Sequence, residues 1–368
     1  MDLGEVIRQL RLARGWSQGR LAAAINERYG TTLAREYVSN WECGKVTPRD
    51  FYLRALSAVL DAPLAAFEDD VRRRTFLTDV AGTAIAPVIA SDLLSDGFAA
   101  RLRGGPSVDE WEGKLATYGT EYMSMGAGDI QRRVSRELVI VQQQLEDTRL
   151  WSVASRLMTL YAKTFPGSDG SKAVHWYRMA AHAADQAGDD EARVWVRGRA
   201  AIALGYEGAS LGFADVLADQ ALAISDTPSL GLLNAVYGRA HAAALRGDRA
   251  TALSLDLQGR RIFDKVGSHE QTSDYAVPWW RLNVFRSLLL ARLGDEKGAV
   301  EAQDQARGAL PPELPRFATH LELHRGLMLV RAGDREGGVA YAQAAMDALP
   351  SEKHSLTLRM LMEEIKKP

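Results

Sequence analysis

A Gly-Asp pair recurs three times in the C-terminal part of the chain, always at the same place in a helical pattern. The pairs are Gly247-Asp248, Gly294-Asp295 and Gly333-Asp334. Five residues after each glycine stands a small residue, and an apolar residue follows it directly. Because Gly-Asp pairs mark turns, this shared register predicts a repeated unit of two helices joined by a tight turn.

The segments around these turns carry helical periodicity. Apolar helices are predicted before the turns, at residues 229–246, 278–293 and 315–332, and an alanine-rich helix is predicted after each. Earlier turns near residues 167–171 and 205–209 extend the pattern, with a period of about forty residues. The sequence therefore predicts an α-solenoid of about five helical hairpins with a closing helix at 352–366.

The hairpins resemble tetratricopeptide repeats in their Gly-Asp turns and small-residue positions. The Trp, Leu-Gly and Tyr signature of that family is only partly present, as in Tyr237-Gly238 and Trp195. The resemblance implies a surface that holds a ligand or a protein. Scaffolding and dimerisation are the alternatives for such an array.

Five short helices are expected before residue 69, and no segment of the chain shows convincing strand alternation. The expected fold is all-α. We divide the chain into a first domain at 1–69, a helical linker at 70–106 and the repeat domain at 107–368.

The segment REYVSNWECG at residues 35–44 has little apolar surface. Val38 and Trp41 are its only large apolar anchors, so its other face is left for polar contacts. Arg35, Glu36 and Asn40 carry side chains that read guanine, cytosine and adenine edges in the DNA major groove. We therefore expect this helix to be a recognition helix that contacts bases through these three residues.

The first domain resembles the DNA-binding domains of the lambda-repressor-like helix-turn-helix group, the XRE family. The residues that carry the resemblance are Trp16-Ser17-Gln18 with Leu21-Ala22, Tyr37 to Gly44, Pro48 and Leu56. The resemblance implies that Gln18, Ser39 and Lys45 contact the DNA backbone, and that Glu42 stabilises the end of the recognition helix. The connection at 26–34 is longer than the tight turn of the family and is expected to lengthen the second helix by a turn.

The charge distribution agrees with DNA binding only locally. The whole chain has a formal net charge of -2, whereas residues 1–60 hold nine basic and six acidic side chains. Because one such domain binds weakly, we expect a homodimer on a roughly palindromic double-stranded operator.

A second candidate site lies in the repeat domain, where residues 266–278 form its longest interruption. The residues proposed to contact a signalling peptide or a small-molecule ligand are Trp279, Trp280, Arg281, Asn283, Arg286 and Asn234. The alternative is that the tryptophans belong to the hairpin core and that the interruption is a plain insertion.

Several other classes of protein are disfavoured. The one cysteine, Cys43, precludes an intramolecular disulfide, and the chain has no long apolar run, so a cytoplasmic protein without a membrane partner is expected. No phosphate-binding or nucleophile-elbow motif indicates an enzyme, and no cofactor is expected. His320 and His324 lie one helical turn apart, but the acidic residue between them is at the wrong position for a zincin, so a solvated or groove-facing surface is favoured over a metal site.

The sequence as a whole predicts a bacterial transcriptional regulator, with an N-terminal operator reader and a solenoid that senses a ligand or assembles the protein. Arginine exceeds lysine and alanine and glycine are abundant, which favours an actinobacterial source. The alternative is a protein-interaction hub in which the first domain does not read an operator.

Overall fold

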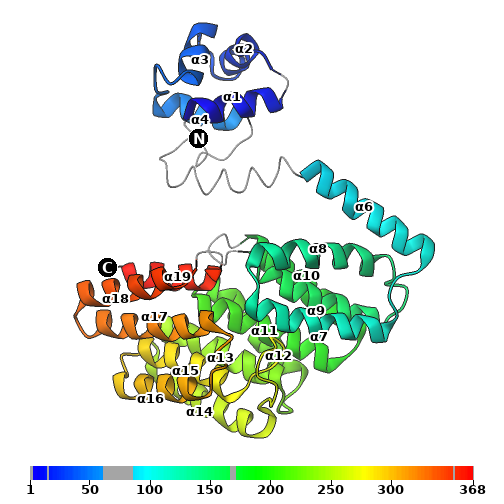
Figure 1. Cartoon of the computed structure of the whole chain (residues 1–368), viewed down its shortest axis with the longest axis vertical. Coiled ribbons are helices and arrows are strands. Elements are labelled where there is room, and N and C mark those ends of the chain that lie inside the picture. Colours follow the sequence, from blue (N-terminus) through cyan, green and yellow to red (C-terminus); the bar gives the residue numbers. More distant parts are fainter. Residues whose placement is uncertain (1–2, 15, 61–85, 166–170, 351–352, 368) are drawn as a thin grey trace. The chain divides into compact units, whose positions relative to one another are not determined.

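The computed structural model describes residues 3–14, 16–60, 86–165, 171–350 and 353–367 (Figure 1). The chain divides into two compact units, Met1–Asp92 and Leu93–Pro368. Helices make up the regular structure of the described residues, without any β-strand. The predicted all-α class is confirmed. No helix among the described residues combines the length and the hydropathy that crossing a membrane requires.

The N-terminal unit contains four described helices, and the fifth one predicted near residues 62–67 lies outside the described residues. Ser17 caps the second helix as expected, because its hydroxyl accepts from the backbone N–H of Arg20. The apolar faces of all four helices meet in one core that includes Ile7, Leu21, Val38 and Leu56. The helices are α1 (Leu3–Ala13), α2 (Gln18–Tyr29), α3 (Arg35–Glu42) and α4 (Asp50–Val59).

The connection between α2 and α3 is organised by Asn26. Its Oδ1 accepts from the Thr31 hydroxyl at 2.6 Å and from the Leu33 backbone N–H at 2.7 Å, and its Nδ2 donates to the Leu33 carbonyl at 2.9 Å. Helix α2 continues to Tyr29 and ends at Gly30, whose φ of 64° is left-handed. One amide therefore fixes the chain that leads into α3.

The second unit is built from helices that pair along the chain. Helix α6 (Ala86–Arg103) crosses from the first unit into the second, and α7 (Val108–Ser124) and α8 (Ala127–Gln142) follow it. The hairpins follow, and then the closing helix: α9 (Leu150–Ala162), α10 (Ser171–Ala187), α11 (Asp190–Glu207), α12 (Leu211–Ile224), α13 (Leu230–Leu245), α14 (Arg249–Val266), α15 (Trp279–Arg292), α16 (Glu296–Ala309), α17 (Pro315–Arg331), α18 (Arg335–Ala348) and α19 (Leu356–Lys366).

The three Gly-Asp pairs form the predicted turns. Their glycines have left-handed φ angles of 79°, 67° and 101° in chain order. The aspartate after each glycine caps the next helix, by accepting from the backbone N–H of Thr251, Gly298 or Gly337. The turn thus ends one helix and starts the next within two residues.

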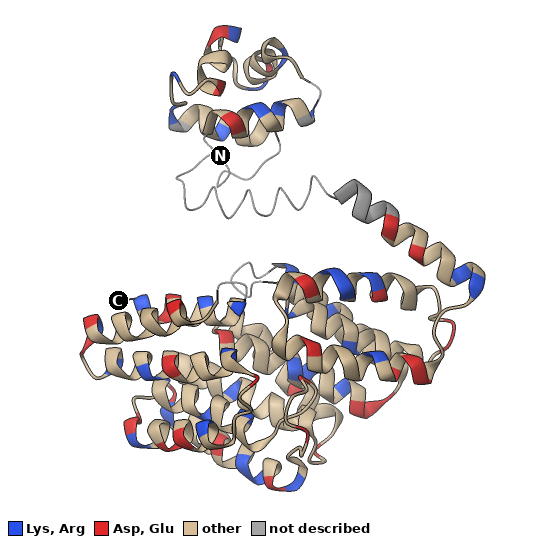
Figure 2. Cartoon of the chain, in the orientation of Figure 1, with Lys and Arg blue, Asp and Glu red and all other residues tan. Residues whose placement is uncertain are grey.

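The first helices of successive hairpins, α11, α13, α15 and α17, pack on one another in series. The backbones of α11 and α13 touch at glycines: a Cβ at Gly198 on α11 would lie 1.9 Å from the Gly231 carbonyl oxygen on α13. These helices are consequently buried on almost every side, and polar residues on them lie inside the unit. Figure 2 shows acidic and basic residues interspersed on α14, α16 and α18, the second helices of three hairpins.

The part of α6 from Leu93 onward falls in the predicted linker and packs within the second unit. Arg136 on α8 pairs with Asp96, and Arg101 pairs with Glu146 at 2.9 Å. The predicted domain boundaries at 69 and 106 stay a prediction.

Candidate functional site

Helix α3 is held to the N-terminal unit by one side. Val38 is fully buried and Trp41 is 3% exposed, with its ring 5.2 Å from that of Tyr52 on α4. Arg35 and Glu36 are exposed at the first turn, next to Tyr37. The other face of α3 is therefore free for an external partner.

A buried ion pair clamps α3 to the two helices before it. Glu42 accepts from Arg11 Nε at 2.6 Å and Nη2 at 2.9 Å, and from Gln18 Nε2 at 2.8 Å. The hydrogen bonds to Glu42 raise the pKa of Arg11, and Arg11 also donates to the Trp16 carbonyl. Arg11, Gln18 and Glu42 come from α1, α2 and α3, so this clamp fixes the orientation of the candidate recognition helix.

The candidate DNA-contacting residues lie as follows. Asn40 and Ser39 are half-buried on α3, and Lys45 is exposed just after it, with its backbone N–H donating to the Asn40 carbonyl at 2.9 Å. Glu36 and Asn40 are four residues apart and share a helix face. Gln18 is half-buried and engaged by Glu42. The roles of these residues toward DNA remain predictions.

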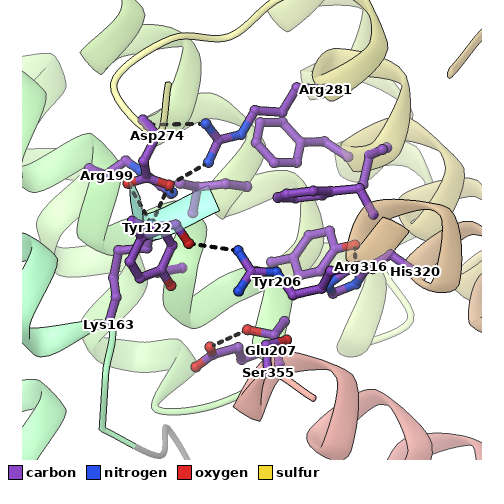
Figure 3. A pocket seen from close by; sticks show the side chains of 16 residues that line it. Tyr122, Lys163, Arg199, Tyr206, Glu207, Asp274, Arg281, Arg316, His320 and Ser355 are labelled. Atoms are coloured by element: carbon purple, nitrogen blue, oxygen red, sulfur yellow. Dashed lines mark hydrogen bonds and ion pairs between the residues drawn. The ribbon is translucent and has the colours of Figure 1, made fainter. Parts of the chain in front are cut away.

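The second unit contains a cavity of about 80 Å³ that the sequence did not reveal (Figure 3). Its lining residues come from α7, α9, α11, α15, α17, α19 and the loop before α15. Aromatic side chains and four basic side chains dominate the wall. The basic ones are Lys163, Arg199, Arg281 and Arg316.

Asp274, in the loop before α15, forms ion pairs with three of the four basic side chains of this wall. Its carboxylate accepts from Lys163 at 2.5 Å, and from Arg199 and Arg281 at 2.8 Å each. Burial opposes ionisation of the carboxyl group, but Arg199, Lys163 and Arg281 outweigh it and hold the pKa of Asp274 well below its usual range. Asp274 is therefore ionised near neutral pH.

The loop that carries Asp274 is rigidly anchored. The Asp274 backbone N–H donates to the Gly119 carbonyl on α7 at 2.8 Å. Arg281 Nη1 donates to the carbonyls of Ser273, Asp274 and Ala276. The interruption at 266–278 is thus an ordered part of the cavity wall.

Arg316 enters the wall from α17. Its Nη2 donates to the carbonyls of Tyr122 at 2.8 Å and Met123 at 3.0 Å, at the end of α7. Its guanidinium also lies over the rings of Tyr122 and Phe317. Within the described part of the chain, Arg316 forms no ion pair.

Glu207 is the second carboxyl group at the cavity. Thr357 on α19 donates to it at 2.9 Å. Burial raises the pKa of Glu207 to about 7, against the hydrogen bond from Thr357 and the charges of Lys163 and Arg199. The native state therefore binds up to one more proton than the unfolded chain between about pH 4.5 and pH 7.

We expect Glu207→Gln to remove this pH dependence. In the parent, the free energy of unfolding contributed by Glu207 falls as the pH rises through this window, because charging the buried carboxyl is unfavourable. The variant should gain about 2 kcal/mol relative to the parent between pH 5 and pH 8. Urea unfolding of both proteins at several pH values measures the difference, and parallel curves would contradict it.

His320 and His324 are buried rather than solvated. Tyr206 Oη lies 2.9 Å from His324 Nε2, and Ser287 Oγ lies 2.9 Å from His324 Nδ1. Burial, and secondarily Arg316, lowers the pKa of His320 to about 3. Of the two predicted surroundings, solvent or a groove, the solvated one is wrong because α17 is an inner helix. His320 lines the cavity. The described residues contain no group of three or more side chains placed to bind a metal ion.

The predicted ligand residues separate in the structure, and only Arg281 lines this cavity. Trp280 is fully buried and Trp279 is 43% exposed, packed against Phe263. Asn283 is also fully buried and donates to the Trp279 carbonyl. Arg286 pairs with Asp256 at 3.1 Å, and Asn234 is buried on α13.

Sequence could hardly have identified the cavity, because its residues span Tyr122 to Thr357. The one local signal was Asp274, an acidic residue in the long interruption directly before Arg281. The other basic residues of the wall, Lys163, Arg199 and Arg316, are distant in sequence and reach the cavity only through tertiary packing.

Comparisons with known proteins add the following. No curated protein matches the chain. The solved structure of PlcR from Bacillus thuringiensis, in complex with the peptide PapR7 and DNA, has 18% sequence identity and a TM-score of 0.36, over 72% of this chain and 94% of that one. Residues 7–67 match the helix-turn-helix family model. The chain therefore carries a helix-turn-helix domain in its N-terminal unit.

Proposed function

We propose that this protein is a sequence-specific DNA-binding transcriptional regulator. The observation that carries the proposal is the geometry of α3 inside a matched helix-turn-helix domain: one face is fixed by Val38, Trp41 and the Glu42 clamp, and the polar face is free. A short helix that packs on the core by one face and exposes its polar face fits the DNA major groove.

In this proposal the polar residues of α3 divide into two sets. Arg35, Glu36 and Asn40 read base edges, since Arg pairs with guanine, Asn with adenine and Glu with cytosine. Gln18, Ser39 and Lys45 contact phosphates and set the register of the helix in the groove.

The proposed regulator acts as a homodimer. A single helix-turn-helix contacts one half-site, and pairing two chains supplies the affinity for a full operator. An exposed apolar stripe on α6 supports pairing: Leu94, Phe98 and Leu102 are 63%, 68% and 83% exposed and stand one helical turn apart.

Replacing the stripe by serine, as Leu94→Ser/Phe98→Ser/Leu102→Ser, is expected to raise the dimer dissociation constant at least tenfold. The reason is the loss of apolar area buried between chains, at about 25 cal/mol per Å². Sedimentation equilibrium measures the constant. An unchanged value would mean that another surface pairs the chains.

The test of the proposed function is selection of genomic DNA fragments by the purified full-length protein at fixed salt. Fixed salt is needed because phosphate contacts alone bind DNA non-specifically. We expect one enriched inverted-repeat site. Failure to enrich any site would overturn operator reading and favour a role in protein interaction.

A further inference from the structure

The solenoid cavity carries an imbalance of charge. Four basic side chains line it, whereas Asp274 and Glu207 are its two acidic ones. Asp274 already accepts from three of the cations, and the pKa of Glu207 lies at about 7, so its negative charge is only partial near neutral pH. Burial, and secondarily Arg199, lowers the pKa of Lys163 well below its usual range, so the three arginines alone carry the secure positive charges of the wall, and they exceed the two acids by at least one charge.

This excess is buried. Arg199 and Arg281 are 5% and 4% exposed, and the side chain of Lys163 is 7% exposed. Taking a charge out of water costs several kcal/mol unless a counter-charge compensates it. Asp274 compensates one cation, and among the described residues no other acid forms an ion pair with these side chains or with Arg316.

Some hydrogen-bond donors of the three arginines in the wall have no acceptor among the described residues. The Nε atoms of Arg199 and Arg281 are buried and donate to no described residue. Arg316 uses only Nη2 for its bonds to Tyr122 and Met123. Guanidinium groups are the preferred partners of carboxylates and phosphates because their donors match two acceptor oxygens at once.

We propose that this cavity binds a small organic anion, whose carboxylate or phosphate group contacts Arg316 and compensates the cationic wall. A cavity of about 80 Å³ admits such a group. The rings of Tyr122, Tyr206, Phe285 and Phe317 line the same cavity and provide apolar contact for a short carbon skeleton.

The position of the cavity gives the anion a role. Its wall joins α7, at the start of the second unit, to α17 and α19 near its end. An anion at Arg316 would stabilise the arrangement of these helices that has the cavity closed around it. The regulatory part of this inference rests on the proposed function: the anion is the effector that changes operator affinity.

Binding is tested by calorimetric titration of the full-length protein with inorganic phosphate and, separately, with succinate. Sodium chloride keeps the ionic strength constant, and acetamide is the uncharged control. We expect one of the two anions to bind, and to raise Tm by about 5 °C at one hundred times its Kd. Which of them binds distinguishes a phosphate from a carboxylate ligand. Neither anion exceeding chloride would overturn the site.

Variants of Arg316 test whether the anion binds at this residue. Arg316→Gln should weaken binding at least tenfold, while Arg325→Gln, which alters an exposed arginine on the same helix, should leave it unchanged. Should Arg316→Gln fail to fold, Arg316→Lys replaces it; it keeps the charge but loses the paired donors, and at least threefold weaker binding is expected. Equal binding by parent and variant would overturn the assignment.

Operator affinity, measured with and without the anion on DNA from the fragment selection, distinguishes the anion site from the proposed regulatory function. If the anion binds and changes operator affinity, the effector role is supported. If it binds without changing that affinity, the site stands and the regulatory part fails. If no operator exists, the proposed function fails, while the titration still decides whether the anion site exists.

Discussion

Arg35→Ala/Asn40→Ala is expected to lower affinity for the selected operator by about a hundredfold or more, and to leave the N-terminal unit folded. Each bidentate contact to a base edge contributes about 1–3 kcal/mol of discrimination, and the double variant removes two. Neither side chain contributes to the core, which Val38 and Trp41 supply. The measurement is a titration of labelled operator at fixed salt, followed by fluorescence anisotropy.

The matched control is Arg8→Ala/Gln9→Ala. It removes one arginine and one side-chain amide from exposed positions on α1, so it changes net charge by the same amount. Affinity for unrelated DNA should fall equally in both variants, since that binding depends on charge. Equal losses of operator affinity would show that Arg35 and Asn40 do not read bases.

Asp274→Asn is expected to destabilise the second unit by about 3–5 kcal/mol at pH 7, because it leaves Lys163, Arg199 and Arg281 buried without their shared counter-charge. The pKa of Asp274 is held well below its usual range, so its contribution is present above the unfolded pKa of about 4 and is lost as the pH falls. Urea unfolding followed by circular dichroism measures the change.

Two further variants make this result specific. Asp264→Asn removes an exposed carboxylate from α14 and should change the free energy of unfolding by less than about 0.5 kcal/mol. Combining Asp274→Asn with Lys163→Met should recover part of the loss, since one uncompensated cation is removed. If Asp274→Asn were as stable as the parent, the three cations would not depend on this carboxylate.

The hairpins could be predicted from sequence because their signals are local. A left-handed glycine and an aspartate cap act within four residues, so the predicted helices at 229–246, 278–293 and 315–332 end within one or two residues of the observed ones. Helix α4 lacks such a local signal: Arg49 before it is extended, no side chain caps it, and it begins at Asp50.

The cavity could not be predicted because no local signal reports which helices are inner. The four-residue spacing of His320 and His324 on α17 places them on one helix face but does not tell whether that face is exposed. The packing of α17 against its neighbours buries both side chains. Trp280 and Asn283 are buried for the same reason on α15. By contrast, Val38 and Trp41 on α3 could be assigned to the core, since they are the only large apolar side chains of a short helix.

The bonds from Arg316 to α7 and from Thr357 to Glu207 join segments 194 and 150 residues apart. A helical array usually interacts only between neighbours, so it can fray from either end while its middle stays folded. Here Arg316 ties the last hairpin to α7 at the start of the unit, and Glu207 on α11 ties the closing helix to the interior. Local opening at a terminus would break these ties, so the second unit should lose its protection against hydrogen exchange as a single cooperative block.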